Sequence, residues 1–131
     1  MQHLDILLAA LAAYGFGAIW YMFLASHWVK ATGIATDDSG QPLNKGAPVP
    51  YIIAFASCLL VAGMMRFVFT QAGIDTWNEA LIGGILIGLF LSVPWLATCY
   101  SFAGRPVQLI LIDGGYAVGG SALAGLVLGV L

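Results

Sequence analysis

The chain has 131 residues, of which 61% are hydrophobic and only 8% carry a formal charge, and its net charge is −2. Soluble domains carry roughly 25% charged residues, so this composition excludes a water-soluble globular domain and predicts an integral membrane protein. The few charges form neither a basic patch nor an acidic tail, so we expect the lipid bilayer and no nucleic acid among its partners.

Four long apolar segments follow one another along the chain. Each is about 20 residues or longer, which is enough for an α-helix to cross the ~30 Å hydrocarbon core of a bilayer. Only helices and closed barrels satisfy their backbone groups in lipid, and these runs are too long for barrel strands. The sequence therefore predicts one all-α transmembrane domain over residues 1–131, a four-helix bundle with helices at about 4–25, 50–70, 77–100 and 106–131.

The first segment lacks the basic n-region of a signal peptide and has a longer apolar run, so it is predicted to be the first transmembrane helix. It ends in Trp20 and Tyr21, and Trp28 and Lys30 follow. Such side chains concentrate where hydrocarbon meets the headgroups, so an interfacial belt is the simpler interpretation and a binding surface the alternative. Residues 26–49 are predicted to be a polar loop, because turn-forming residues and prolines accumulate there.

The second and third segments carry charges at the membrane side opposite to that loop. Arg66 lies about one turn from the end of the second segment, and a structural role is predicted for it, paired with Asp5 or Glu79. Thr76 and Glu79 fit the capping box S/T-x-x-E, so Glu79 is interpreted as a helix cap rather than a catalytic acid. Pro94 is predicted to bend the third helix, because it removes a backbone hydrogen bond.

Asp113 is the only charged side chain in the fourth segment. A carboxylate at the bilayer centre costs roughly 3 kcal/mol unless it faces a partner or water. Tyr116, three residues further on, shares its helix face, and Gly114 and Gly115 are expected to leave backbone groups available. The sequence predicts a polar-aromatic pocket near the interface, formed by Trp20, Tyr21, Trp28, Lys30, Arg105, Asp113 and Tyr116. The alternatives for Asp113 are an acceptor that pins the fourth helix to the first, a ligand or ion site, and a proton relay.

Small residues recur at four-residue spacing in every segment. Lipid removes most of the hydrophobic drive for helices to associate, so close approach through small residues is expected to hold the bundle together. The fourth helix has two small faces; one is expected to pack within the bundle and the other against a neighbouring copy, which predicts a homo-oligomer. The predicted packing glycines are Gly17, Gly84, Gly88, Gly115, Gly119, Gly125 and Gly129.

The basic residues suggest an orientation. Lys30 and Lys45 lie in the first connection and Arg105 in the third, whereas only Arg66 lies near the second. The positive-inside rule therefore predicts that the first and third connections are cytoplasmic and that both termini are outside.

Two passages of this sequence resemble a known family. One is G-x-x-W-Y near the end of the first helix, with W-x-K after it; the other is G-R-P…L-I-D-G-G-Y over residues 104–116. On these passages the chain resembles domain-of-unknown-function family 1761, whose members are small membrane proteins of bacteria. The resemblance covers essentially the whole chain. The commoner family pattern has S-P after W-Y, where this chain has Met22 and Phe23. The resemblance implies four helices in the bacterial inner membrane, gives no established activity, and points to the residues of the predicted pocket.

The sequence does not favour an enzyme, a cofactor or a metal. It contains no nucleophile–base pair, carboxylate pair or metal-ligand spacing, and Cys58 and Cys99 are interpreted as packing residues in apolar segments. The expected function is non-enzymatic helix–helix association, as a homo-oligomer or an accessory subunit of a membrane complex. A small transporter or channel with Asp113 in its path, and a protein that binds a lipid or other amphiphile in the aromatic pocket, are the alternatives.

Overall fold

The computed structural model describes residues 2–43 and 46–131, and Lys45 lies outside them. Among the described residues, four helices have the length and hydropathy to cross a membrane. This confirms the predicted all-helical class. The helices are α1 (Gln2–Phe23), α2 (Ala25–Thr32), α3 (Val49–Ala72), α4 (Trp77–Ile87), the π-helical turn η1 (Gly88–Ser92), α5 (Val93–Phe102) and α6 (Val107–Val130).

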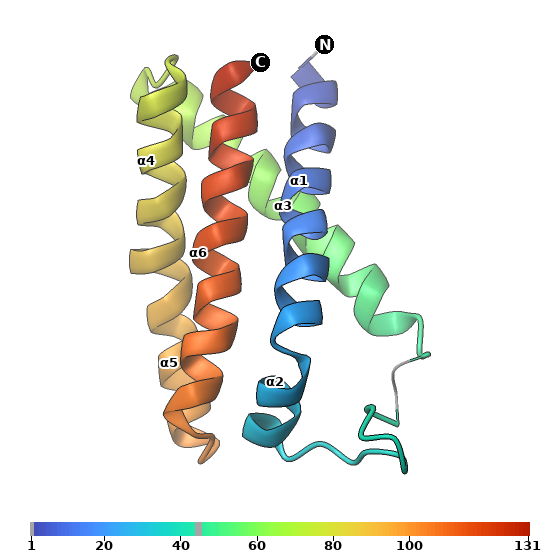
Figure 1. Cartoon of the computed structure of the whole chain (residues 1–131). Coiled ribbons are helices and arrows are strands. Elements are labelled where there is room, and N and C mark those ends of the chain that lie inside the picture. Colours follow the sequence, from blue (N-terminus) through green and yellow to red (C-terminus); the bar gives the residue numbers. More distant parts are fainter. Residues whose placement is uncertain (1, 44–45) are drawn as a thin grey trace.

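The bundle is organised around α6. In Figure 1, α6 stands between α4 and α5 on one side and α1 on the other, while α3 runs obliquely behind them and packs chiefly against α1. Both chain termini lie at one end, which we call the terminal end (Figure 1). The opposite end carries α2 and the connection between α5 and α6, and we call it the loop end.

One small face of α6 packs against α4 at backbone distance. A Cβ atom on Gly84 would meet the backbone carbonyl of Ser121, and one on Gly88 would lie 2.6 Å from the Cα of Val118. A Cβ on Gly125 would in turn meet the carbonyl of Ala80. Backbone atoms cannot rotate out of the way as side chains do, so these glycines set the separation of the two helices.

The other small face of α6 receives aromatic rings from α1. Trp20 covers Gly115, and Phe16 covers Gly119. Both small faces are therefore occupied within one chain, and the prediction that one of them serves a neighbouring copy is wrong. The physical reason is the central position of α6, which needs a close-packing face toward α4 and another toward α1.

The core between the helices is built from small side chains. Ala9, Ala62 and Ala80 are fully buried, and Met65 and Phe69 are the large side chains among them. Many large apolar side chains are exposed instead, as expected for helices that face lipid rather than water. The small residues let the helices approach closely, and the larger buried side chains Met65, Phe69, Leu109, Ile112 and Leu128 fill the remaining space.

Pro94 lies directly after the π-helical turn η1. The N–H of Val93 donates to the carbonyl of Gly88, five residues earlier, so the helix is locally widened before the proline. Wider turns of this kind accommodate the missing N–H and the ring of proline inside a helix. The structure thus places a π-helical turn directly before Pro94, and the predicted bend of the third helix stays a prediction.

Residues 26–49 are not entirely a loop, because Ala25–Thr32 form the helix α2. Trp28 and Val29 are half-buried whereas Lys30 is exposed, so this short helix is amphipathic. Gly33 ends it in a left-handed conformation (φ 67°), with its N–H donating to the carbonyl of Val29. The sequence did not predict this helix, because it has only eight residues and most of the residues around it are polar.

Candidate functional site

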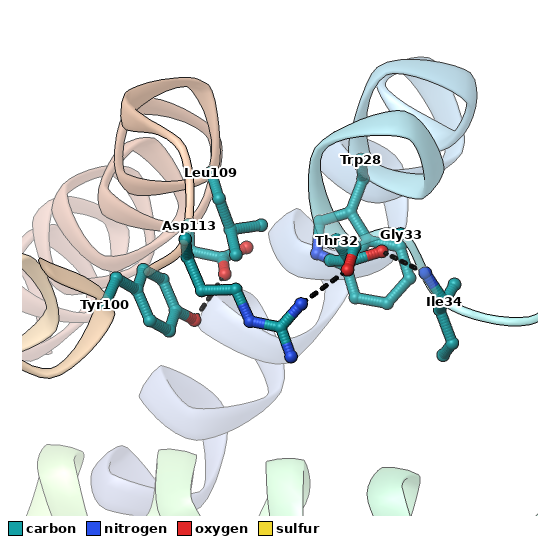
Figure 2. A pocket seen from close by; sticks show the side chains of 8 residues that line it. Trp28, Thr32, Gly33, Ile34, Tyr100, Leu109 and Asp113 are labelled. Atoms are coloured by element: carbon teal, nitrogen blue, oxygen red, sulfur yellow. Dashed lines mark hydrogen bonds between the residues drawn. The ribbon is translucent and has the colours of Figure 1, made fainter. Parts of the chain in front are cut away.

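A cavity of about 360 Å³ opens at the loop end between α2, α5 and α6 (Figure 2). Trp28 and Thr32 of α2 face Tyr100 and Asp113 across it. We call this cavity the interfacial pocket; it is lined by Trp28, Thr32, Gly33, Ile34, Tyr100, Arg105, Leu109 and Asp113.

The Asp113 carboxylate joins three helices. The hydroxyl of Tyr21 on α1 donates to its Oδ1 at 2.5 Å, and the hydroxyl of Tyr100 on α5 donates to its Oδ2 at 2.6 Å. Hydrogen bonds to an ionised acceptor are shorter and stronger than neutral ones, so this pair of donors compensates much of the cost of placing the charge on a membrane helix. Asp113 remains half-buried and contributes to the wall of the pocket.

Two further aromatic residues support α6 beneath the pocket. The indole N–H of Trp20 donates to the carbonyl of Ile112 at 2.8 Å. The ring of Tyr116 lies edge-on to that of Tyr21, with centroids 5.5 Å apart, and its hydroxyl is 3.5 Å from the sulfur of Cys58. These contacts fix α6 against α1 and α3, so Trp20 and Tyr116 position the pocket without lining it.

The α6 helix is continuous through Gly114 and Gly115. The expectation that these glycines leave backbone groups available is therefore wrong. They serve packing instead: Gly115 makes room for the ring of Trp20, and a Cβ on Gly114 would lie 3.2 Å from a methyl group of Val93.

Arg105 is held at the mouth of the pocket by the turn between α5 and α6. Gly104 is left-handed (φ 72°), its N–H bonds the carbonyl of Ser101, and the N–H of Arg105 bonds that of Tyr100. This is the Schellman pattern, which fixes the backbone after a helix. The guanidinium then donates to the carbonyl of Thr32 at 2.6 Å, and this bond ties the last turn of α2 to the mouth of the pocket.

Of the seven residues predicted for the pocket, three line it, three support it from behind and one lies outside it. Trp28, Arg105 and Asp113 line it and Tyr21 binds its carboxylate, but Lys30 is exposed and is not among the lining residues. Sequence reasoning missed Tyr100, which binds the carboxylate, and the lining residues Thr32, Gly33, Ile34 and Leu109. The short connection between the third and fourth helices was the available signal for Tyr100, because a tight helical hairpin brings the end of one helix beside the start of the next.

A second polar cluster lies toward the terminal end. Arg66 pairs with Asp5 at 2.5 Å and also donates to the carbonyl of Leu128 at 2.8 Å, so it links α3 to α1 and α6. Glu79 is exposed and does not join this cluster. The capping-box interpretation is also wrong: α4 does begin after Thr76, but the Thr76 side chain makes no capping hydrogen bond.

Metal-binding groups of three or more His, Cys, Asp or Glu side chains do not occur among residues 2–43 and 46–131. Within that part of the chain, Cys58 is a buried free thiol and Cys99 an exposed one.

No curated protein and no solved structure matches this chain. One family model does match, and it spans residues 4–129, from the first turn of α1 to the last turn of α6. That match includes the interfacial pocket, the Asp5–Arg66 pair and the four candidate spans except for one residue at each outer end. The chain therefore belongs to the DUF1761 family of proteins of unknown function.

Proposed function

We propose that this protein is a non-catalytic, multi-pass protein of the bacterial inner membrane that binds a membrane amphiphile in the interfacial pocket. The observation that carries the proposal is the composition of that cavity. Arg105 and Asp113 provide both signs of charge, and Trp28, Ile34 and Leu109 provide apolar walls within the same volume of about 360 Å³. Ligand sites are typically concave, mostly apolar and equipped with a few convergent polar groups.

The depth of the pocket favours an amphiphile over a water-soluble ligand. Its wall includes Asp113, which at ~1.5 Å rise per residue lies ~9 Å from the start of α6 at Val107. The polar interfacial layer of a bilayer is ~5–8 Å thick on each side, so a pocket that reaches from the start of α6 to Asp113 crosses the level where headgroups meet hydrocarbon. An amphiphile presents a polar and an apolar part at this level without leaving the membrane.

The contacts of Asp113 support a binding role rather than a catalytic one. Each carboxylate oxygen accepts a tyrosine hydroxyl, and no second carboxylate and no histidine lines the pocket among the described residues. The interpretation of Asp113 as a pin for α6 agrees with the same contacts, because the two tyrosines that anchor the helix also hold the pocket wall in place.

Native mass spectrometry of the protein, purified in mild detergent and supplied with phospholipid, tests the proposal. Trp28→Ala removes a large part of the pocket wall, so we expect about tenfold weaker lipid retention than for wild type. Trp95→Ala is the matched control, because Trp95 is an exposed indole on α5 outside the pocket. Equal retention by the two variants, or no retained lipid on wild type, would contradict the proposal.

Association and transport stay predictions beside this proposal. A homo-oligomer or a contact with another subunit would have to use faces other than the two small faces of α6, which α4 and α1 already cover. A pull-down from native membranes, with wild type and Asp113→Asn, tests a partner. A liposome flux assay with the same variant tests whether Asp113 lines a transport path.

A further inference from the structure

The interfacial pocket contains two opposite charges that do not neutralise each other. Among the described residues, no cation lies within ion-pair distance of Asp113, whose bonds are to the neutral hydroxyls of Tyr21 and Tyr100. Arg105 likewise binds a neutral group, the backbone carbonyl of Thr32. Both side chains line the same cavity. Asp113 is half-buried, so an ammonium group in the pocket would add an ionic partner to its two tyrosine bonds. Arg105 is exposed and has donors left for an anionic group of the same occupant.

We propose that the pocket selects a zwitterionic headgroup, with an ammonium group at Asp113 and a phosphate or similar anionic group at Arg105. This inference rests on the proposed amphiphile-binding function and adds the chemical class of the ligand. A purely anionic headgroup would satisfy Arg105 and be repelled by Asp113, and a neutral one would form an ion pair with neither.

The Asp113 side of the pocket is suited to an ammonium group. A carboxylate offers about four lone-pair positions, of which the tyrosine hydroxyls use two, so each oxygen can accept another hydrogen bond. The tyrosine donors also fix the orientation of the carboxylate. Trp28 lines the same cavity, and an indole ring is the best aromatic partner for a cation.

The Arg105 side is suited to a phosphate group. A guanidinium carries five N–H donors in a planar fork that matches phosphate geometry. Its bond to Thr32 uses the Nη1 nitrogen and holds the side chain in place, so the other donors of the fork are available to a ligand. The backbone of Arg105 is itself fixed by the left-handed turn at Gly104.

The size of the pocket limits the occupant to the headgroup region. About 360 Å³ lies near the lower end of the ~300–1,000 Å³ typical of small-molecule sites. Leu109 and Ile34 provide apolar contact for the part of the ligand that continues into hydrocarbon. The acyl chains themselves are then expected to stay in the bilayer.

A competition experiment measures this selectivity directly. The purified protein in mild detergent receives equimolar phosphatidylethanolamine and phosphatidylglycerol with identical acyl chains, and native mass spectra report which lipid is retained. We expect wild type to retain phosphatidylethanolamine about tenfold over phosphatidylglycerol. Asp113→Asn should abolish this preference, whereas Asp38→Asn, the same change at an exposed position of the long loop, should keep it.

Arg105→Gln should weaken retention of both lipids, because both carry the phosphate. Lys30→Gln is its matched control, since it removes a cation from the neighbouring helix outside the lining of the pocket. A probe that needs no substitution is N-acetyl phosphatidylethanolamine, which keeps the phosphate and loses the ammonium charge. Wild type is expected to retain it about tenfold less than phosphatidylethanolamine.

Soluble glycerophosphoethanolamine distinguishes a lipid headgroup from a free zwitterion. If it displaces the bound lipid at millimolar concentration, the headgroup alone is recognised; if the lipid stays bound while the ammonium preference holds, the lipid is the ligand. Both results support the zwitterion. Equal retention of the N-acetyl lipid, or a preference that survives Asp113→Asn, would overturn it and leave amphiphile binding intact. Absence of any retained lipid on wild type would overturn both proposals.

Discussion

Asp113 shows how one carboxylate is accommodated on a membrane helix by neutral donors alone. Tyr21 and Tyr100 each contribute a hydroxyl, and they belong to α1 and α5, which lie on different sides of α6. The same three side chains therefore solvate the charge and hold three helices in register at the loop end. Arg66 has the corresponding role toward the terminal end, where its guanidinium binds both Asp5 and a carbonyl of the last turn of α6. A cation there also interacts favourably with the helix dipole.

The two tyrosine bonds should be measurable as stability. Tyr21→Phe and Tyr100→Phe each remove one hydroxyl donor from the carboxylate and keep the ring, so each is expected to lower the free energy of unfolding by about 1–2 kcal/mol. The double variant should lose more than the sum, because Asp113 then loses both donors. Titration with sodium dodecyl sulfate, followed by helix content, provides the measurement.

Tyr14→Phe is the matched control for these variants. Tyr14 also lies on α1, and its ring packs edge-on against Phe55 with centroids 5.6 Å apart, a contact that phenylalanine retains. We expect a change below about 0.5 kcal/mol. A loss at Tyr14 equal to that at Tyr21 or Tyr100 would show that the Asp113 bonds add nothing to stability.

At the scale of elements, α6 is the helix on which the others depend. It presents glycines to the backbone of α4 on one side and to aromatic rings of α1 on the other. These two kinds of contact differ in how well they tolerate a larger residue in place of the glycine. A ring such as Trp20 can shift when a neighbour grows, whereas the Ser121 carbonyl opposite Gly84 is fixed by its own helix.

Gly84→Ala should therefore separate α4 from α6. The added methyl group would overlap the Ser121 carbonyl, so we expect a loss of about 2 kcal/mol or more, measured by the same detergent titration. Gly63→Ala is the control, because Gly63 lies on α3 with no atom within 4 Å of an added Cβ. There the higher helix propensity of alanine should leave stability unchanged or raise it by up to about 1 kcal/mol. If both substitutions behaved alike, close approach at Gly84 would not be what holds the two helices together.

The sequence predicts a helix well when the interactions that form it are local along the chain, and predicts the partners of that helix poorly. Each membrane helix satisfies its own backbone bonds, so length and hydropathy along the chain were sufficient to locate all four spans. The partners of each helix are not local. The spacing of glycines indicated two small faces on α6 but not that α4 and α1 would cover both. For the same reason the sequence offered Arg66 two acidic partners, and only the arrangement of α1 beside α3 selects Asp5.

The sequence likewise predicted part of the candidate site. Asp113 was identified from its cost in a membrane helix, and Tyr21, Trp28 and Arg105 from their place near the same interface. Tyr100 was missed because its role depends on the tight turn at Gly104 and on the side chain reaching across the helical hairpin. Lys30 was included in error because sequence distance alone does not reveal which side of α2 faces the pocket.

At the scale of the whole molecule, the polar groups divide into two clusters separated by an apolar core. Asp5 and Arg66 lie toward the terminal end, and Asp113 with its tyrosines lies toward the loop end. Fully buried alanines such as Ala9, Ala62 and Ala124 lie in the core that packs the helices together. The arrangement is polar at both interfaces and apolar at mid-depth, as the bilayer requires.

The fold makes the predicted orientation of this bundle in the membrane more specific. The termini lie together at one end, and Lys30 and Arg105 lie at the other, so a single orientation satisfies the positive-inside rule with the loop end in the cytoplasm. We expect alkaline phosphatase fused after Leu131 to be active and green fluorescent protein fused there to be dark, with the reverse when either is inserted at Gly40. Lys30→Glu combined with Arg105→Glu should weaken this asymmetry, because it removes two of the three cations in the first and third connections. A fluorescent C-terminal fusion in the wild-type chain would place the interfacial pocket in the outer leaflet and direct the search for its ligand to lipids of that leaflet.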